Sequence, residues 1–494
     1  SNNTAFGLEA LKTNISGSSN TAVGRDALES NTADNNVAVG HCSLLSNSSG
    51  TANTAVGTRA MKFTTTASDN TAVGYQTMDS NTEGCCNTAV GSDALGTNSV
   101  GNCNTAVGKN ALLSNTSASE NSALGVGALL ANTTGCRNTA IGYNSLAVNT
   151  EGCCNVSIGR TALDANTTGD FNTAVGNSAL SGNTTADNNT AVGYFALNAN
   201  TTGDLNTAVG LCAFSTQTTA RKNTGVGSKV GASTTTGGSN VAMGQDSFRT
   251  NTTGSENTAI GTLSLYANTT GNSNTAVGCG SLDANTTASQ NTAMGYESMG
   301  VTSTGCKNVA VGANSLVANT TGNFNTAIGK SAFERSTTAT CNTGVGLNAL
   351  EQLTTGASNV SIGRFSGADA MINLTTENNR GAFGHNNITN AYVKVAWTVT
   401  SDARDKMNFE SVPHGLDFVN KLEPYKFNFK KSREIEAPHG SARYGFKAQD
   451  ILKLEGDDNV IIDNENTESL KYNGEALVPV LVNAIKELKA EIEL

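Results

Sequence analysis

The chain has 494 residues, with 30 Lys and Arg against 40 Asp and Glu and a formal net charge of −10. The acidic balance and the lack of a basic cluster argue against nucleic-acid binding, which requires a Lys/Arg footprint. No apolar run approaches the roughly 18 residues of a membrane span, so membrane insertion is not expected.

Composition divides the chain near residue 390. All eleven cysteines lie before that point, whereas all four prolines and the only tryptophan lie after it. Charged residues make up roughly a tenth of the first part and about a third of the second. We therefore expect a repeat shaft over 1–363, a connecting or tip segment over 364–400 and a separate domain over 401–494.

A 17-residue repeat fills the first three quarters of the chain. Its motif, Asn-Thr-Ala-Val-Gly or a close variant, begins at Asn3, Asn20 and Asn36 and then at every seventeenth residue from Asn53 to Asn359, in 22 copies. The consensus is N-T-A-V-G-x-x-A-L-x-x-N-T-T-G-x-x. The first position is always Asn, the fifth is always Gly, and the ninth is apolar in 20 copies.

The repeat predicts a mainly β fold. T-A-V is short, partly β-branched and bounded by turn residues, which is typical of a strand. N-T-T-G predicts a turn in which Asn and Gly adopt left-handed backbone angles. Copies stacked about 4.8 Å apart would form a parallel β-solenoid on the order of 100 Å long. The first-position Asn is expected to stack on its neighbours through its amide, and the fifth-position Gly to mark a tight bend or a close chain contact.

Strand alternation separates two faces of each coil. The second and fourth positions (Thr88 and Val90 in one copy) share one face, and the third and fifth (Ala89 and Gly91) share the other. We expect Val90 to point inward and the Ala and Gly ranks to form a flat surface for self-association. An outward Thr array of the kind that binds ice is then disfavoured, because Thr88 would face inward with Val90.

The motifs "NTAVG" and "NVSIG" resemble the head repeats of trimeric autotransporter adhesins of the YadA-like kind. They are also similar to arrays in fibre proteins of bacteriophages and other viruses. The resemblance implies a homotrimer of parallel β-rolls.

The cysteines do not follow metal-site spacing, and the four histidines (His41, His385, His414 and His439) are few and scattered. We expect no metal and no cofactor. Cys86 and Cys103 share the seventeenth position of successive coils, and Cys136 and Cys153 share the sixteenth. Successive coils place such Cα atoms about 5 Å apart, within disulfide range. Two ladder disulfides are one hypothesis, and free, small, buried thiols are the other.

The last hundred residues predict a small α+β domain. Strands are expected over 425–430 and 459–463, and a helix over 445–454. The final helix, 474–494, carries a coiled-coil-like apolar seam. The seam residues are Leu477, Leu481, Ile485, Leu488 and Ile492.

Three motifs in this region, "SDARDK" at 401–406, "GFKAQDI" at 445–451 and "LVPVLVNAIKELKAEI" at 477–492, resemble the peptidase S74 family. This family comprises intramolecular chaperones of phage tail spikes and fibres. The resemblance implies a trimeric chaperone that registers the preceding β-structure and then cuts itself off. It implies cleavage at Ser401–Asp402, with Ser401 as nucleophile and Lys406 as general base.

The implied chemistry is physically reasonable. A Ser hydroxyl attacks only when a base takes its proton, and a Lys serves as base when burial lowers its pKa. Attack by Ser401 on its own carbonyl would close a strained four-membered ring. Either a neighbouring group or subunit assists, or the cut lies on the other side of Ser401. The alternative interpretation of "SDARDK" is an ordinary capped helix start.

Together these features predict a homotrimeric phage tail fibre that binds a host-surface receptor, expected to be a glycan, and joins other tail proteins. It would be made in the host cytoplasm and act in the virion. At most it would be a self-cleaving protease. The alternatives are a cellular trimeric adhesin, an ice-binding solenoid and a glycan-degrading tailspike. The last needs paired carboxylates in a groove, whereas the repeats place Asp and Glu only sporadically.

Overall fold

The computed structural model describes residues 2–369, 372–385, 387–388, 392, 394, 401–430, 433, 435–456, 459–464, 467–468 and 470–493. The chain divides into two compact units. The solenoid unit comprises Ser1–Val360 and Thr375–Gly381, and the C-terminal unit comprises Ser361–Leu374 and Ala382–Leu494. Part of the predicted 364–400 segment, namely 370–371, 386, 389–391, 393 and 395–400, lies outside the described residues. Within the described ranges, no helix combines the length and apolar character that a membrane crossing requires.

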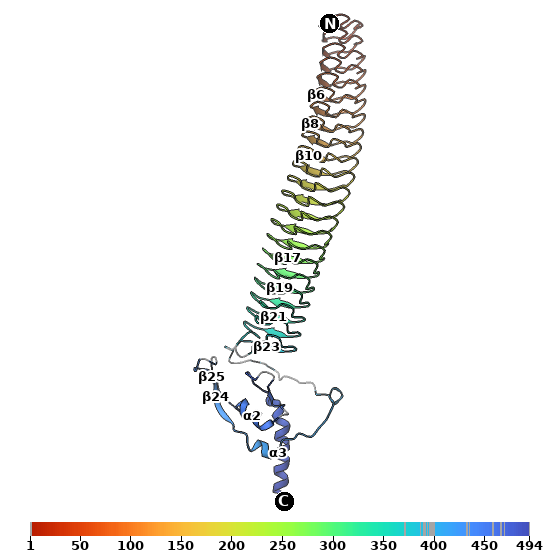
Figure 1. Ribbon diagram of the computed structural model, residues 1–494. Helices are drawn as coiled ribbons and strands as arrows, with labels where there is room; N and C mark the ends of the chain where they lie inside the picture. The colour runs from red at the N-terminus through yellow and green to blue at the C-terminus, as the bar shows by residue number, and fades with distance from the viewer. Residues whose placement is uncertain are drawn as a thin grey trace. The chain divides into compact units, whose positions relative to one another are not determined.

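Each repeat folds as one coil with a three-residue strand at its second to fourth positions, and one further strand follows the last repeat (Figure 1). The strands are β1 (Thr4–Phe6), β2 (Thr21–Val23), β3 (Val37–Val39), β4 (Thr54–Val56), β5 (Thr71–Val73), β6 (Thr88–Val90), β7 (Thr105–Val107), β8 (Ser122–Leu124), β9 (Thr139–Ile141), β10 (Val156–Ile158), β11 (Thr173–Val175), β12 (Thr190–Val192), β13 (Thr207–Val209), β14 (Thr224–Val226), β15 (Val241–Met243), β16 (Thr258–Ile260), β17 (Thr275–Val277), β18 (Thr292–Met294), β19 (Val309–Val311), β20 (Thr326–Ile328), β21 (Thr343–Val345), β22 (Val360–Ile362) and β23 (Gly381–Phe383).

Successive strands pair in parallel, so equivalent repeat positions lie one above another. Between β6 and β7, for example, Thr88 aligns with Thr105 and Val90 with Val107. The same register holds across the one-residue deletion, where Thr21 aligns with Val37. The predicted parallel β-solenoid of 17-residue coils is therefore confirmed.

The predicted direction of the strand side chains is wrong. Ala89 is completely buried, whereas Thr88 and Val90 are exposed, Val90 by 37%. The third position therefore faces the coil interior, and the second and fourth positions face outward.

The size of the ninth-position side chain explains this reversal. The third position lies against the ninth-position side chain of the coil before it. Where that side chain is Phe214, the third position is Gly225, and a Cβ added there would lie 2.4 Å from the Phe214 ring. The same exchange occurs at Gly344 beside Phe333, at 2.5 Å. The narrow interior therefore accepts one large side chain per coil and only a small one opposite it.

The first-position asparagines form a buried ladder, as predicted. The Asn104 Oδ1 accepts the backbone N–H of Asn121 at 3.0 Å. Its Nδ2 donates to the Asn87 Oδ1 at 3.2 Å and to the Ala118 carbonyl at 2.9 Å. Each Asn thus satisfies polar groups on both neighbouring coils, which a buried amide requires.

A second buried ladder runs through the twelfth position, where the sequence indicated only a turn. The Asn98 Nδ2 donates to the Asn81 Oδ1 at 2.7 Å and to the Gly101 carbonyl at 3.0 Å. The side chain therefore closes its own turn and also binds the coil before it.

The prediction that left-handed backbone angles occur in the N-T-T-G turn is also wrong. Positive φ angles occur at the seventh, ninth and seventeenth positions, as at Asp93 (58°), Leu95 (51°) and Cys103 (57°), rather than in N-T-T-G. A left-handed residue with a Cβ costs about 1–2 kcal/mol. Stacking and hydrogen bonding on both sides fix these positions despite that cost. The fifth-position Gly91 has φ +133°, and a Cβ there would lie 2.6 Å from the Gly108 carbonyl oxygen, so the predicted close contact is confirmed.

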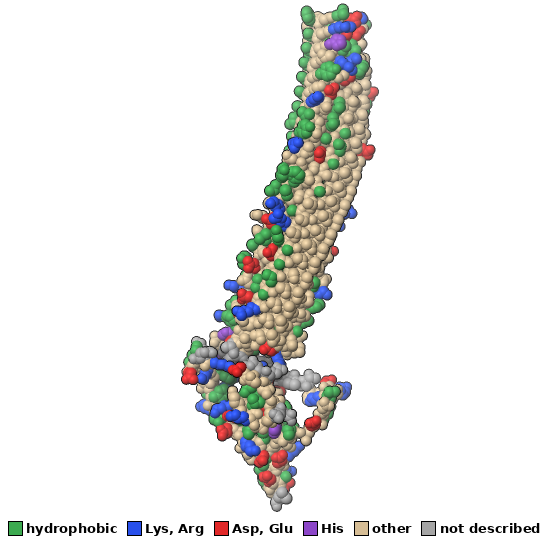
Figure 2. Space-filling model, in the orientation of Figure 1, with side chains coloured by type: hydrophobic (Ala, Val, Ile, Leu, Met, Phe, Trp, Pro, Cys, Tyr) green, Lys and Arg blue, Asp and Glu red, His purple; other side chains and the backbone are tan. Residues whose placement is uncertain are grey.

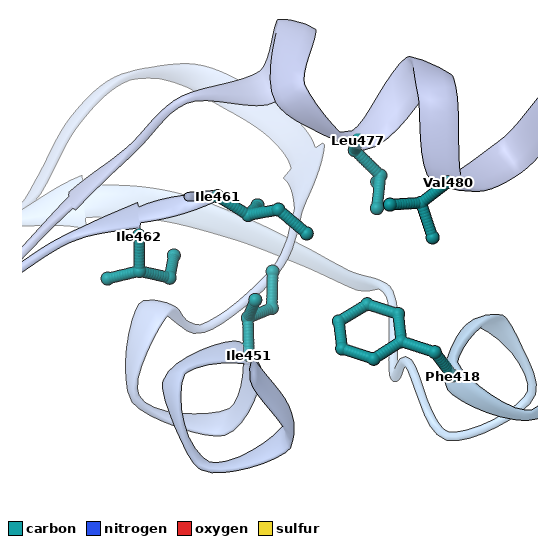
Figure 3. Packing of buried hydrophobic residues seen from close by; sticks show 6 residues of the cluster. All are labelled: Phe418, Ile451, Ile461, Ile462, Leu477 and Val480. Carbon is teal, nitrogen blue, oxygen red and sulfur yellow. The ribbon is translucent and has the colours of Figure 1, made fainter. Parts of the chain in front are cut away.

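The C-terminal unit is the small α+β domain that the sequence predicted. Its elements are η1 (Ala403–Asp405), α1 (Leu416–Val419), β24 (Tyr425–Lys430), β25 (Pro438–Gly445), α2 (Ala448–Glu455), β26 (Ile462–Asp463), β27 (Lys471–Tyr472), η2 (Gly474–Ala476) and α3 (Leu477–Ile492). The strands β24 and β25 pair antiparallel, as do β26 and β27. Side chains from α1, α2, α3 and the β26 segment form the core (Figure 3). The core residues are Phe418, Ile451, Ile461, Ile462, Leu477 and Val480.

Candidate functional site

Ser401 and Lys406 are brought together by a single turn of 3-10 helix, η1. The Lys406 Nζ donates a hydrogen bond to the Ser401 Oγ at 2.6 Å. The turn brings together two residues that lie five positions apart in the sequence. The contact has the geometry that a Ser nucleophile and its Lys base require.

Asp402 caps the turn that carries this pair. Its carboxylate accepts the Arg404 backbone N–H at 2.9 Å and pairs with the Arg404 guanidinium at 2.6 Å. These contacts hold the pKa of the Asp402 carboxyl below its ordinary value, chiefly through the Arg404 side chain. The capped helix start and the Ser–Lys contact therefore coexist in one short segment.

The surroundings of the pair are open. Ser401 and Lys406 are both exposed in the part of the chain that the structure describes. A Lys acts as a general base only when it loses its proton, and removal from water favours that loss. The single chain thus provides the contact between the two side chains but leaves them in water.

The two predicted disulfide pairs lie on adjacent coils, and all eleven cysteines are free thiols in this structure. The Cys136 and Cys153 sulfur atoms are 3.1 Å apart, and the Cys136 backbone N–H donates to the Cys153 Sγ at 3.0 Å. Partial burial raises the pKa of the Cys153 thiol. Cys86 and Cys103 are exposed. Both disulfides stay predictions.

Two glutamates of the C-terminal unit had no signal in the sequence. The buried Glu455 carboxylate accepts the backbone N–H groups of Val460, Ile461 and Ile462 at 2.9, 2.6 and 2.9 Å. The Glu487 carboxylate on α3 accepts the Leu416 N–H at the start of α1, at 2.6 Å. Both contacts join elements that only the tertiary fold brings together.

Residues 401–461 match the model of the peptidase S74 family, described as the chaperone of endosialidase. The match begins at Ser401 and ends in the segment that Glu455 holds. No curated protein and no solved structure matched the chain. The C-terminal segment is thus similar to the chaperone of endosialidase, and here it follows a long β-solenoid.

Proposed function

We propose that the chain is a homotrimeric fibre of the phage tail-fibre or tailspike kind, which reaches toward a host surface and uses its C-terminal unit to align three chains. The observation that carries this proposal is an apolar stripe along the solenoid that a single chain leaves exposed. The similarity of residues 401–461 to the chaperone of endosialidase supports the same conclusion.

The strand-face stripe consists of the outward side chains at the second and fourth positions of the coils. The fourth position is Val, Ile, Leu, Met or Phe in every copy. Figure 2 shows hydrophobic side chains at the shaft surface along its length. Exposed large side chains of the stripe include Val90, Leu124, Ile141, Ile158, Val226, Val241, Met243, Ile260, Met294, Val309, Ile328, Val360 and Ile362. Monomeric proteins rarely expose an apolar patch of more than a few hundred Å², so a stripe this long indicates an interaction surface.

The final helix carries a second unpartnered apolar surface. Leu477 packs into the core of the C-terminal unit. The rest of the predicted seam is exposed, with Leu481 at 39%, Ile485 at 66%, Leu488 at 45% and Ile492 at 76%. An apolar seam of 4-4-3-4 spacing suits packing against the same helix of other chains. The number three comes from the resemblance to YadA-like heads and to the S74 chaperones.

A trimerising end would solve a physical problem of the repeat. Because all coils are alike, neighbouring chains can pair one coil out of register at almost no local cost. A C-terminal unit that associates first would set the register before the shafts pack. Burial between chains would also remove Lys406 from water and so activate it toward Ser401.

One substitution pair tests the stripe. Light scattering of the full chain is expected to give three times the chain mass. Ile260→Lys puts a charge into the stripe and is expected to yield smaller or aggregated species. Thr262→Lys, at the exposed sixth position two residues away, is the matched control, since Lys109 and Lys330 already occupy that position. A monomeric wild-type chain, or an unchanged trimer in Ile260→Lys, would refute the proposed interface.

Attachment to a host is the wider part of the proposal and rests on the fibre architecture and the resemblance. The expected partners are a host-surface glycan and other tail proteins, in a virion assembled from protein made in the host cytoplasm. Labelled full-length trimer applied to a panel of bacterial cells and to a glycan array tests this role. Failure to bind any of them, by a chain that is trimeric, would count against attachment but not against trimerisation.

Ice binding is a second candidate function, favoured by the corrected orientation of the strands. The second-position Thr and the fourth-position aliphatic residue both face outward on regularly spaced parallel strands, as at Thr88 and Val90. Thermal hysteresis of the full chain tests this candidate. Shafts whose stripe is buried in a trimer are expected to show none.

A further inference from the structure

Three side chains with metal-binding atoms meet where the second and third coils stack. Asp26 and Cys42 occupy the seventh position of successive coils, and His41 precedes Cys42. The Cys42 Sγ lies 3.4 Å from the His41 Nε2 and 3.8 Å from the Asp26 Oδ2. The His41 Nε2 and the Asp26 Oδ2 are 3.8 Å apart. A sulfur, a nitrogen and an oxygen thus form a compact triangle.

The triangle has the size of one face of a tetrahedral zinc site. Bonds of about 2.3 Å to sulfur and about 2.0–2.2 Å to nitrogen and oxygen, at tetrahedral angles, separate these atoms by roughly 3.4–3.6 Å. The three observed distances fall within about 0.4 Å of that range. We propose that Asp26, His41 and Cys42 bind a divalent cation of the zinc class, with the fourth position open to water.

The solenoid holds two of these ligands in place independently of any ion. The Cys42 backbone N–H donates to the Arg25 carbonyl at 3.0 Å, which fixes the two seventh positions one above the other. Both residues have left-handed φ angles, 60° at Asp26 and 56° at Cys42. The Asp26 side chain is only 13% exposed. Little reorganisation is therefore needed to form the site.

Carboxylates lie beside the triangle, and Lys12, Arg25 and Lys62 offset their charge. The carboxylates of Glu9, Asp26 and Glu29 all have oxygens within 4.8 Å of one another. Lys12 offsets part of this charge through contacts of 3.1 Å to Glu9 and 3.7 Å to Glu29. Arg25 lies 3.3 Å from the Asp26 Oδ2 but is itself 66% exposed. An exposed ion pair of this kind contributes little, so a bound metal ion can displace it.

The donor set decides which ion fits. A thiolate with an imidazole favours zinc and related transition metals, whereas calcium and magnesium prefer oxygen alone. Burial and the Asp26 carboxylate raise the pKa of the Cys42 thiol. Binding therefore has to displace the thiol proton, as is usual for metal sites with cysteine.

Cobalt(II) titration of the reduced full-length chain provides the first test, since a thiolate ligand gives a charge-transfer absorption. Three variants remove one ligand each: Asp26→Asn, His41→Ser and Cys42→Ser. Each introduces a residue that the repeat already carries at that position, as at Asn110, Ser92 and Ser178 respectively.

Each ligand variant is expected to bind cobalt at least about tenfold more weakly than the wild-type chain, since even groups behind a metal ligand contribute 10- to 100-fold. Cys212→Ser is the matched control. Cys212 also occupies a seventh position, but Leu211 stands where His41 does. This control is expected to keep the wild-type affinity. The proposal would be overturned if Cys42→Ser kept the wild-type cobalt spectrum and cobalt affinity. It would also be overturned if Asp26→Asn and His41→Ser both bound cobalt with the wild-type affinity.

A second measurement resolves Cys42 from the other ten cysteines. The chain is alkylated with and without Zn²⁺, and each cysteine peptide is quantified by mass spectrometry. Zinc is expected to slow the alkylation of Cys42 in the wild-type chain. In His41→Ser this slowing is expected to disappear, and the alkylation of Cys212 is expected to be the same with and without zinc. Equal alkylation of Cys42 with and without zinc would overturn the proposal.

Discussion

The substitution Asn104→Ala removes one side chain of the first-position Asn ladder. It tests directly how much this ladder contributes to the stability of the shaft. The substitution deletes the oxygen that accepts the Asn121 N–H at 3.0 Å. It also deletes the donor to the Ala118 carbonyl at 2.9 Å and to the Asn87 Oδ1 at 3.2 Å; the Asn87 oxygen keeps the Asn104 backbone N–H at 2.9 Å. The Ala118 carbonyl keeps a second bond from the Asn115 Nδ2 at 3.0 Å, whereas the Asn121 N–H loses its acceptor.

The magnitude follows mainly from the loss of the acceptor of the Asn121 N–H and of the bond to the Ala118 carbonyl. A buried N–H left without a partner costs about 1–3 kcal/mol, and one lost bond at a carbonyl that keeps another costs about 0.5–1.5 kcal/mol. Asn121 is completely buried, so water cannot replace the missing oxygen. We expect Asn104→Ala to destabilise the shaft by about 2–4 kcal/mol.

The matched control is Asn102→Ala, two residues earlier. The Asn102 side chain also accepts a backbone N–H from the coil before it, that of Cys85 at 2.7 Å, but this bond is exposed. Water replaces it, so the cost is expected to stay within about 0.5 kcal/mol.

Guanidinium unfolding of the reduced full-length variants, combined with hydrogen exchange read by mass spectrometry, measures both effects. Because repeat proteins open locally as well as globally, exchange of the Asn121 amide reports the loss at its site. Equal stability and equal exchange at residue 121 in the two variants would refute the assignment of the ladder as a main source of shaft stability.

Three further changes test the remaining sites. Ser401→Ala is expected to leave folding intact and to abolish any self-cleavage on a denaturing gel with intact-mass analysis, and a variant cut at the same bond would remove Ser401 from the mechanism. Partial burial raises the pKa of Asp164, so the folded chain binds this proton more readily than the unfolded chain and wild-type stability falls as pH rises through that pKa. Asp164→Asn should therefore raise Tm at pH 7, and this gain should shrink toward zero at about pH 3, below the ordinary Asp pKa; equal gains at both values would contradict the reasoning. Mild oxidation is expected to join Cys136 and Cys153 first, faster at higher pH because the thiolate is the reactive form, and non-reducing mass spectrometry that finds both thiols free would exclude the bond.

In the C-terminal unit, local sequence patterns predicted the secondary structure, whereas the contacts between elements were visible only in the fold. The strand at 425–430 was found with the same bounds as β24, because its alternating apolar pattern is local. The helix expected over 445–454 begins at Ala448, three residues later than expected. The Glu487 contact had no local signature, since its partner Leu416 lies 71 residues away along the chain. The Glu455 contacts span only 5–7 residues, but they depend on how the chain turns back after α2.

For the candidate site, the motif "SDARDK" identified Ser401 and Lys406 by resemblance, and the tertiary structure added their 2.6 Å contact. Nothing in the spacing of His41 and Asp26 along the chain indicates that their side chains meet. Their relation depends on the stacking register, which places residues about one coil apart in contact. A histidine that stands apart from other metal-binding side chains in the sequence can therefore lie beside them in the fold.

The 17-residue period by itself determined the parallel β-solenoid, because a repeat with one short strand and regular turns can bury its apolar residue only by stacking on its own copies. It also determined the buried Asn ladder, since identical amides on adjacent coils bond to one another. Only the tertiary structure decided which strand face points inward. Alternation places Ala89 and Val90 on opposite faces of the strand but does not decide which face is inside. The space beside the ninth-position side chain decides it. This space accommodates the methyl group of Ala89, and Val90 faces outward.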